Sequence, residues 1–254
     1  MEKITSVANS KIKEILKLKD TKYRNQSQRF IVEGFHLVME ALNKGTVLTI
    51  LGTGHGIESL TSNIKNADQI IEISDSIAHK LSDTVKTQAV FAVCEMPKPS
   101  IDFQNNILLL DKVQDPGNIG TLIRSGASFN FKTIITAPNS VSFYNDKVLR
   151  STQGTFFDVN LINDDLISVI KLLKTNGYTI IGTELHSSYK KLADLECQKY
   201  SKVALLIGNE AQGISQTLLD YIDLNVVIEM RAGIESLNAG VAGSIIMYQL
   251  YNKK

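Results

Sequence analysis

Residues 205–215 read LLIGNEAQGIS, and residues 226–250 read VVIEMRAGIESLNAGVAGSIIMYQL. In each stretch a short apolar run breaks at small and polar residues, first at Gly208 and again between Met230 and Asn238. Apolar runs of this length predict buried strands, and the breaks place polar groups where those strands end. Ligands of open α/β sheets collect at the carboxyl ends of the strands, so both breaks are expected to border a binding site.

The rest of the C-terminal half repeats this alternation of strand and helix. Strands are expected over 107–113, 132–138, 156–162, 178–185, 203–210 and 225–230, and helices over 118–129, 165–177, 215–222 and 236–251. Strands that alternate with helices and read as continuous apolar runs predict an α/β fold with a buried parallel sheet.

The N-terminal half predicts a smaller α/β unit. Strands are expected over 30–34, 46–51, 69–74 and 89–96, with helices over 9–20 and 36–44. The stretch MPKPSIDFQNN at 96–106 holds two of the four prolines and several turn formers, which is typical of a linker. We therefore predict a first domain over 1–96, a linker over 97–106 and a second domain over 107–254.

Charge is unevenly spread along a nearly neutral chain. The formal net charge is +1, yet residues 1–32 hold eight lysines and arginines against three acidic residues. A basic N-terminal face suits a phosphate backbone, and a solvated helix face would look the same in the sequence.

Several kinds of site and location are excluded by composition. The two cysteines, Cys94 and Cys197, and the four histidines form no metal-ligand spacing, so neither a metal site nor a disulfide scaffold is expected. No apolar run could serve as a signal peptide or cross a membrane. The expected location is the reducing cytoplasm.

A third segment, LLLDKVQDPGNIGTLIRSGASFN at 108–130, places Asn118 and Arg124 on one helix after a strand. Asn118 could cap this helix or act in a site. Arg124 could form a surface ion pair, or grip an RNA phosphate with two parallel hydrogen bonds. Leu122, Ile123 and Phe129 are expected to pack around Arg124 and keep it partly enclosed.

Taken together, the three segments resemble motifs 1, 2 and 3 of the SpoU family of RNA 2′-O-methyltransferases, in the knotted SPOUT superfamily. The resemblance implies a trefoil-knotted methyltransferase domain that binds S-adenosylmethionine. It also implies transfer of a methyl group to a ribose 2′-hydroxyl of structured RNA, ribosomal RNA rather than transfer RNA. The same chemistry on transfer RNA, and a non-catalytic RNA-binding or ribosome-assembly protein of the same fold, are the alternatives.

The resemblance also assigns the site residues. It implies that the cofactor is bound by Gly208, Asn209, Ile228, Met230 and Leu237, and that the catalytic residues are Asn118, Arg124, Glu210, Ser236 and Asn238. Ser236 could instead be the N-cap of the last helix. Two positions depart from the family pattern, Glu229 where proline is usual and Ala232 where glycine is usual, and both affect the shape of the cofactor loop.

The proton acceptor is left open by the sequence. The family assigns this role to the motif 1 arginine, here Arg124, although arginine is essentially always protonated. A phosphate clamp by Arg124, with Glu210 or a water molecule accepting the proton, fits the residues equally well.

Two further expectations concern partners. The N-terminal half resembles the family's substrate-binding domain, which is similar to kink-turn-binding ribosomal proteins, through Phe30 to Gly34 and the helix that follows. The C-terminal helix is apolar on more than one side and carries small residues at Gly240, Ala242, Gly243 and Ser244. This pattern predicts a homodimer built from this helix and the motif 1 helix, unless the N-terminal domain covers the second apolar side.

Overall fold

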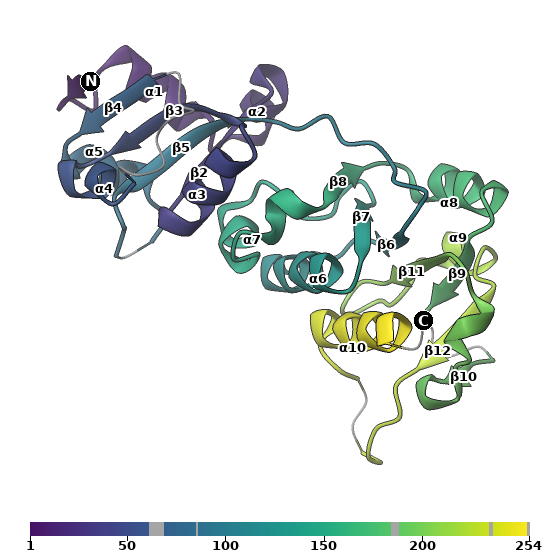
Figure 1. The fold of residues 1–254 in the computed structure, drawn as a ribbon. Coiled ribbons are helices and arrows are strands. Elements are labelled where there is room, and N and C mark those ends of the chain that lie inside the picture. The colour runs from purple at the N-terminus through teal and green to yellow at the C-terminus, as the bar shows by residue number, and fades with distance from the viewer. Residues whose placement is uncertain (61–68, 85, 184–187, 234–235, 253–254) are drawn as a thin grey trace. The chain divides into compact units, whose positions relative to one another are not determined.

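The computed structural model describes residues 1–60, 69–84, 86–183, 188–233 and 236–252 (Figure 1). Contacts within the chain divide it into two units, Met1–Lys98 and Pro99–Lys254. Each unit has its own sheet and its own core, so the two are described separately.

The N-terminal unit is built on a five-stranded mixed sheet in the order β1-β4-β3-β5-β2. Its strands are β1 (Glu2–Ile4), β2 (Arg29–Glu33), β3 (Val47–Gly52), β4 (Gln69–Ile73) and β5 (Val90–Glu95). The described helices are α1 (Ser10–Lys17), α2 (Thr21–Ser27), α3 (Phe35–Asn43), α4 (Gly54–Glu58) and α5 (Asp75–Leu81). β5 runs antiparallel to β2 and β3, whereas β1, β4 and β3 run parallel.

The core of this unit forms because helical and strand periods place apolar side chains on facing surfaces. Ile12 of α1 and Ile77 of α5 pack with Leu51 and Phe91 of the sheet in one buried cluster. The four strands that the sequence predicted here are confirmed. The fifth, β1, is only three residues long and was not predicted from the sequence.

The C-terminal unit contains a seven-stranded sheet in the order β10-β12-β9-β11-β6-β7-β8, with every neighbouring pair parallel. The strands are β6 (Asn106–Leu110), β7 (Phe131–Thr136), β8 (Asn160–Asn163), β9 (Thr179–Gly182), β10 (Lys190–Lys191), β11 (Val203–Ile207) and β12 (Leu224–Val227). The expected α/β fold with a parallel sheet is confirmed. The trefoil knot stays a prediction.

Helices cover both faces of this sheet. They are α6 (Pro116–Ser128), α7 (Asp146–Ser151), α8 (Leu166–Thr175), α9 (Gln216–Leu219) and α10 (Ala239–Asn252). α8 and α9 share a buried cluster with Leu109 and Leu206. α10 approaches Ile207, whose side chain points to the opposite face from Leu206 because strand side chains alternate. α6 lies beside α10 (Figure 1).

Small residues let α6 and α10 come together within one chain. A Cβ atom on Gly243 would lie 2.4 Å from the Leu122 side chain, and the hydroxyls of Ser125 and Ser244 are hydrogen-bonded at 2.7 Å. We expected these small residues of α10 to receive a partner chain, and for Gly243 and Ser244 that interpretation was wrong. Their contacts serve the packing of α10 on α6.

Two boundaries differ from the sequence-based expectation. Residues 156–162 were expected to form one strand, but Thr155–Asp158 form a 3-10 turn and the strand is limited to β8. The aromatic rings of Phe156 and Phe157 contact each other in this turn, which packs on α6. The last helix begins at Ala239 rather than at Ser236.

Residues 101–106 pack against the C-terminal unit. Ile101 and Phe103 contact its buried cluster, and Tyr178 Oη donates a hydrogen bond of 2.7 Å to the carbonyl oxygen of Asn105. The side-chain oxygen of the buried Asn106 accepts a hydrogen bond of 3.1 Å from the backbone N–H of Val203.

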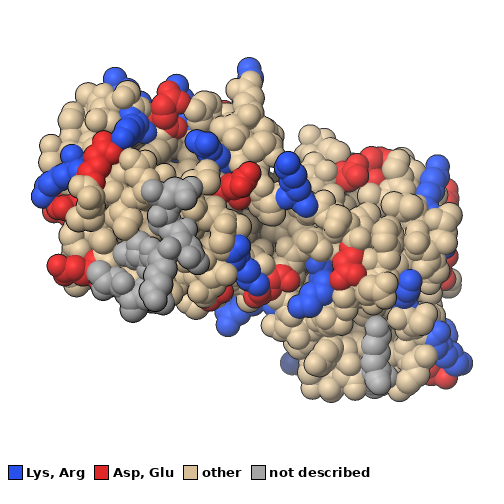
Figure 2. Space-filling model, turned by 45° about the horizontal axis from the view of Figure 1, so that its top comes forward, with Lys and Arg blue, Asp and Glu red and all other residues tan. Residues whose placement is uncertain are grey.

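The basic N-terminal segment is largely paired with acids of its own unit. Lys3 binds Glu72, Lys11 binds Glu2, Lys17 binds Glu14 and Lys19 binds Asp83, at 2.5–2.9 Å. Lysines, arginines and acidic residues are accordingly interspersed over this surface (Figure 2). The excess of basic residues in 1–32 therefore does not create a continuous positive face.

Candidate active site

A cavity of about 680 Å³ lies where β9, β11 and β12 end at their carboxyl edges. Its wall combines a polar loop, an apolar strand end and the start of α10. It is lined by Thr183, Ile207, Gly208, Asn209, Glu210, Ala211, Gln212, Gly213, Val226, Val227, Ile228, Met230, Ser236, Leu237, Asn238, Ala239, Ala242 and Ile246. This volume and this mixture of apolar wall and few polar groups are typical of small-molecule sites.

The cavity collects most of the residues that the sequence singled out. All five residues expected to bind the cofactor line it, namely Gly208, Asn209, Ile228, Met230 and Leu237. Of the residues expected to be catalytic, Glu210, Ser236 and Asn238 line it, whereas Asn118 and Arg124 do not. Glu235 of the same motif lies outside the described residues.

The loop after β11 is closed by its own hydrogen bonds. Asn209 and Gly213 exchange two backbone hydrogen bonds of 2.9 Å. The Asn209 side chain accepts from the backbone N–H groups of Ala211 and Gln212, and donates to the carbonyl oxygen of Lys112 at 2.9 Å. Asn209 therefore fixes the loop shape and ties it to the segment before α6.

Gly208 is required by this loop itself. A Cβ atom at position 208 would lie 2.3 Å from the carbonyl carbon of Gly213 and 2.4 Å from the amide nitrogen of Ile214. From the sequence we expected glycine here to let a ligand approach the backbone. The close neighbour that the structure places there is the chain's own backbone, which cannot move aside cheaply.

The replacement Gly208→Ala is therefore expected to lower the free energy of unfolding of the C-terminal unit by at least ~2 kcal/mol, because overpacking against backbone forces the loop open. Urea unfolding followed by circular dichroism measures this loss. Gly54→Ala is the matched control, because nothing lies within 4 Å of a Cβ atom at position 54. Equal stability of the two variants would contradict the expectation.

Asn118 is freed from helix capping by its neighbour. The side chain of Asp115 accepts a hydrogen bond of 2.8 Å from the Asn118 backbone N–H, so Asp115 is the N-cap of α6 and Pro116 occupies the first turn. The buried Asn118 side chain instead donates from Nδ2 to Glu210 Oε1 at 2.9 Å. This hydrogen bond joins motif 1 to motif 2 at the rim of the cavity.

Glu210 is held by several donors. Besides Asn118, the backbone N–H groups of Asp115 and Gln114 donate to its carboxylate at 3.2 and 3.4 Å. Partial burial on its own would raise the pKa of Glu210, but these hydrogen bonds together lower the pKa below the ordinary value of 4.5. A carboxylate with a lowered pKa stays ionised at neutral pH and is a weak base.

Replacing Asn118 with alanine is expected to raise the pKa of Glu210, because it removes the strongest of these donors. Since the folded-state pKa lies below 4.5, ionised Glu210 stabilises the fold above that value, and this stabilisation is lost as the pH falls through the folded-state pKa. In Asn118→Ala the loss should begin at a higher pH. A carbon-13 NMR titration of the Glu210 carboxyl measures the shift, with Asn252→Ala as control; an unchanged pKa would refute the link.

Arg124 is exposed on α6. The interpretation that neighbouring apolar side chains enclose it was wrong, because Leu122 and Ile123 point into the core while Arg124 lies on the open side of the helix. Within the described part of the chain, its guanidinium has no hydrogen-bond or ion-pair partner. Its charge is therefore available to a molecule outside this chain.

Asn238 caps α10. Its side-chain oxygen accepts from the Val241 backbone N–H at 3.2 Å, and its carbonyl oxygen accepts from the Ala242 N–H at 2.9 Å. Ser236 lies two residues before the cap and is exposed at the cavity, so helix capping does not explain it. Among the lining residues, Thr183, Ala242 and Ile246 were missed by the sequence analysis. The helical spacing from Asn238 to Ala242 and Ile246 could have indicated the last two.

Other chemistry finds little support among the residues that the structure describes. Burial raises the pKa of the Cys94 thiol to about 12, and Cys197 is also buried, so neither is poised as a nucleophile. In the described ranges no group of three or more histidine, cysteine, aspartate or glutamate residues could hold a metal ion. None of the helices described there is long and apolar enough to span a membrane.

Comparisons with known proteins agree with this geometry. A model of the SpoU rRNA Methylase family matches residues 105–248, and a model of the MRM3-like substrate binding domain matches residues 9–92. The 23S rRNA (guanosine(2553)-2′-O)-methyltransferase RlmP of Bacillus subtilis is 33% identical over 253 residues, which cover 98% of this chain and 99% of that protein.

Solved structures show the same fold. An AdoMet-bound rRNA methyltransferase from Sinorhizobium meliloti matches with a TM-score of 0.88 at 23% identity, over 99% of this chain and 97% of that one. The SpoU methyltransferase AviRb of Streptomyces viridochromogenes, in complex with AdoMet, matches with a TM-score of 0.84 at 25% identity, over 96% of this chain and 98% of that one. With three motif segments in place, a family model matched over more than half its length and a full-length relative, the chain belongs to the SpoU rRNA methylase family.

Proposed function

We propose that the protein transfers a methyl group from S-adenosylmethionine to a ribose 2′-hydroxyl of ribosomal RNA. The observation that carries the proposal is the single cavity bordered by motifs 2 and 3, with motif 1 tied to its rim through Asn118 and Glu210. The full-length relative from Bacillus subtilis is named for this chemistry on 23S rRNA. Family membership makes the cytoplasm, where ribosomal RNA is modified, the proposed location.

The residues of the cavity fit this cofactor. Val226, Ile228 and Leu237 offer apolar surface for a purine, and the closed loop 208–213 offers backbone groups for polar atoms. Gly208, Asn209 and Met230 complete the proposed cofactor site. When bound there, S-adenosylmethionine supplies an electrophilic methyl group on a positively charged sulfur.

We propose that this chain's residues orient the ribose rather than act as a strong base. Arg124 is always protonated, and the lowered pKa of Glu210 makes its carboxylate a poor proton acceptor at neutral pH. The arginine is proposed to grip a phosphate, while Asn118, Glu210, Ser236 and Asn238 shape the site around the attacking oxygen. The proton then passes to water as the new oxygen–carbon bond forms, and alignment of the hydroxyl can supply several kcal/mol of the barrier.

Mapping of ribose 2′-O-methyl groups in RNA from a deletion strain tests this function. One ribosomal RNA nucleotide is expected to lose its methyl group and to regain it from the purified protein and S-adenosylmethionine. Loss of a methyl group from a transfer RNA instead would support the alternative substrate. Calorimetry that detects no binding of S-adenosylmethionine would support a non-catalytic RNA-binding protein.

A homodimer is proposed from an apolar stripe on α10. Val241, Ile245 and Tyr248 are 45%, 38% and 50% exposed and follow one helical side. The Phe129 ring, 5.5 Å from that of Tyr248, extends the stripe to the end of α6. A two-fold axis through this stripe would bury it and bring Arg124 of each chain towards the site of the other. Light scattering decides: a mass near 28.1 kDa, the single-chain value, would reject the dimer.

The N-terminal unit is proposed to bind the RNA substrate, with the domains divided as predicted at 1–96, 97–106 and 107–254. Removal of residues 1–96 is expected to leave a folded protein that binds S-adenosylmethionine and has lost most of its RNA affinity. Support comes from the separate core of Met1–Lys98 and from the substrate-binding model over 9–92. Fluorescence anisotropy with a ribosomal RNA fragment measures the loss, and undiminished affinity would give this unit another role.

A further inference from the structure

Arg150 near the end of α7 has a charged nitrogen that nothing in the described chain satisfies. Its Nη1 atom is fully enclosed and has no hydrogen-bond partner there, and its guanidinium pairs with no described acid. Nearly all buried polar groups are hydrogen-bonded, because an unpaired buried donor costs its full desolvation energy. An enclosed cation without an anion is therefore expected to have a function.

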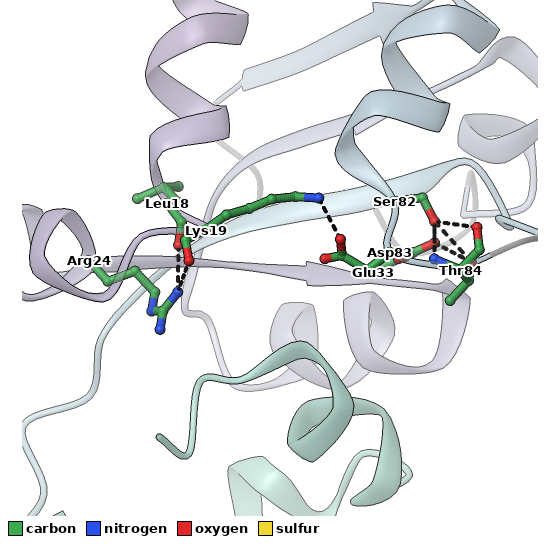
Figure 3. A network of polar contacts seen from close by, with 7 residues as sticks. All are labelled: Leu18, Lys19, Arg24, Glu33, Ser82, Asp83 and Thr84. Carbon is green, nitrogen blue, oxygen red and sulfur yellow. Dashed lines mark hydrogen bonds and ion pairs between the residues drawn. The ribbon is translucent and has the colours of Figure 1, made fainter. Parts of the chain in front are cut away.

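A buried arginine elsewhere in the chain shows the contrasting arrangement. In the N-terminal unit Arg24 donates from Nη1 to the carbonyl oxygens of Leu18 and Lys19 at 2.9 and 2.8 Å, and from Nη2 to the Thr21 hydroxyl at 2.8 Å (Figure 3). These contacts hold the turn between α1 and α2, so Arg24 serves the fold. Arg150 makes no comparable side-chain contact in the C-terminal unit.

α7 is fixed directly beside the motif 1 helix. A Cβ atom on Gly120 would lie 2.2 Å from that of Ser151, so α6 and α7 touch backbone to backbone. Lys147 Nζ lies 4.0 Å from the carboxylate of Asp115, the N-cap of α6. Arg150 thus belongs to the flank of the helix whose Asn118 reaches Glu210 at the cavity rim.

This flank faces away from the apolar stripe of α10. Gly120 contacts α7, whereas Leu122 contacts α10, and two residues along a helix turn the direction by about 200°. A partner chain bound at the stripe would therefore not supply an anion to Arg150. Arg124 and Lys147, both exposed, add positive charge on the same helices. A polyanion is the ligand that fits several cations spaced along one flank.

From this placement we infer that Arg150 binds a backbone phosphate of the RNA substrate next to the nucleotide that enters the site. The inference rests on the proposed function for the identity of the RNA. Arginine suits the role because its planar fork can donate two parallel hydrogen bonds to one phosphate. Arg150 is a positioning residue, which fixes the strand while other groups meet the ribose.

Binding of full-length 23S rRNA transcript, without cofactor, tests the inference at several salt concentrations. Arg150→Gln is expected to weaken binding about 10-fold or more, and to lower the slope of log K against log salt by about 0.7 to 0.9. Cofactor affinity and melting temperature should stay at wild-type values. Lys171→Gln, an exposed change on α8 across the sheet, is the control and should alter neither quantity.

Three results would overturn the inference: unchanged affinity and slope in Arg150→Gln, a change in dimer mass that assigns the anion to the partner chain, or wild-type RNA affinity in a folded Arg150→Lys. The last variant keeps the charge and loses the fork, so it also serves if Arg150→Gln does not fold. Because binding is measured without turnover, a protein that binds RNA through Arg150 and transfers no methyl group would refute the proposed function alone.

Discussion

The variant Arg124→Ala is expected to lose about 10³-fold in methyl-transfer rate while its affinity for S-adenosylmethionine stays nearly unchanged. Arg124 is exposed on α6 and does not line the cavity, so removing it should leave the cofactor site intact. Tritium transfer to ribosomal RNA gives the rate, and calorimetry gives the affinity. A rate within a few-fold of wild type would remove Arg124 from the mechanism.

A mixing experiment asks whether Arg124 acts across the proposed two-fold axis. Arg124→Ala chains are combined with chains whose cavity is blocked by Ala242→Phe, and each protein alone should be inactive. If Arg124 of one chain completes the site of the other, half of the mixed dimers' sites are intact, and the mixture should recover about a quarter of the wild-type rate. No recovery, with dimers shown by light scattering, would place Arg124 in the site of its own chain.

The variant Ala242→Phe is expected to weaken S-adenosylmethionine binding about 100-fold or more, which corresponds to ~2.7 kcal/mol. Ala242 lies on α10 one turn after the cap residue Asn238 and lines the cavity. A phenyl ring there would occupy space that the ligand needs, in a cavity that has room for the ring without displacing the core.

Calorimetry measures this affinity, and thermal unfolding confirms that the variant is folded. Thr217→Phe, which adds a ring at an exposed position of α9 outside the lining, is the matched control. Tight cofactor binding by folded Ala242→Phe would mean that the ligand uses a different surface.

Most elements of this fold could be predicted from local sequence. β6, β7, β9, β11 and β12 follow continuous apolar runs, and such runs are buried in a parallel sheet whatever their neighbours. The residues after β11 and β12 could be predicted to share one site, because parallel strands end at one edge. The weaker predictions lay at element ends, as at residues 156–162, where aromatic packing overrode the strand pattern.

The roles of individual polar residues depended on contacts between distant segments. Asn118 and Glu210 are 92 positions apart, and only their hydrogen bond decides between helix cap and site residue for Asn118. The exposure of Arg124 and the unpaired nitrogen of Arg150 likewise depend on how α6 meets α7 and α10. The sequence by itself determined the strands, the helices and the edge that carries the site, because periodicity and turn chemistry act locally. Only the tertiary structure decided which donor meets which acceptor, because hydrogen bonds require a defined distance and angle that packing alone provides.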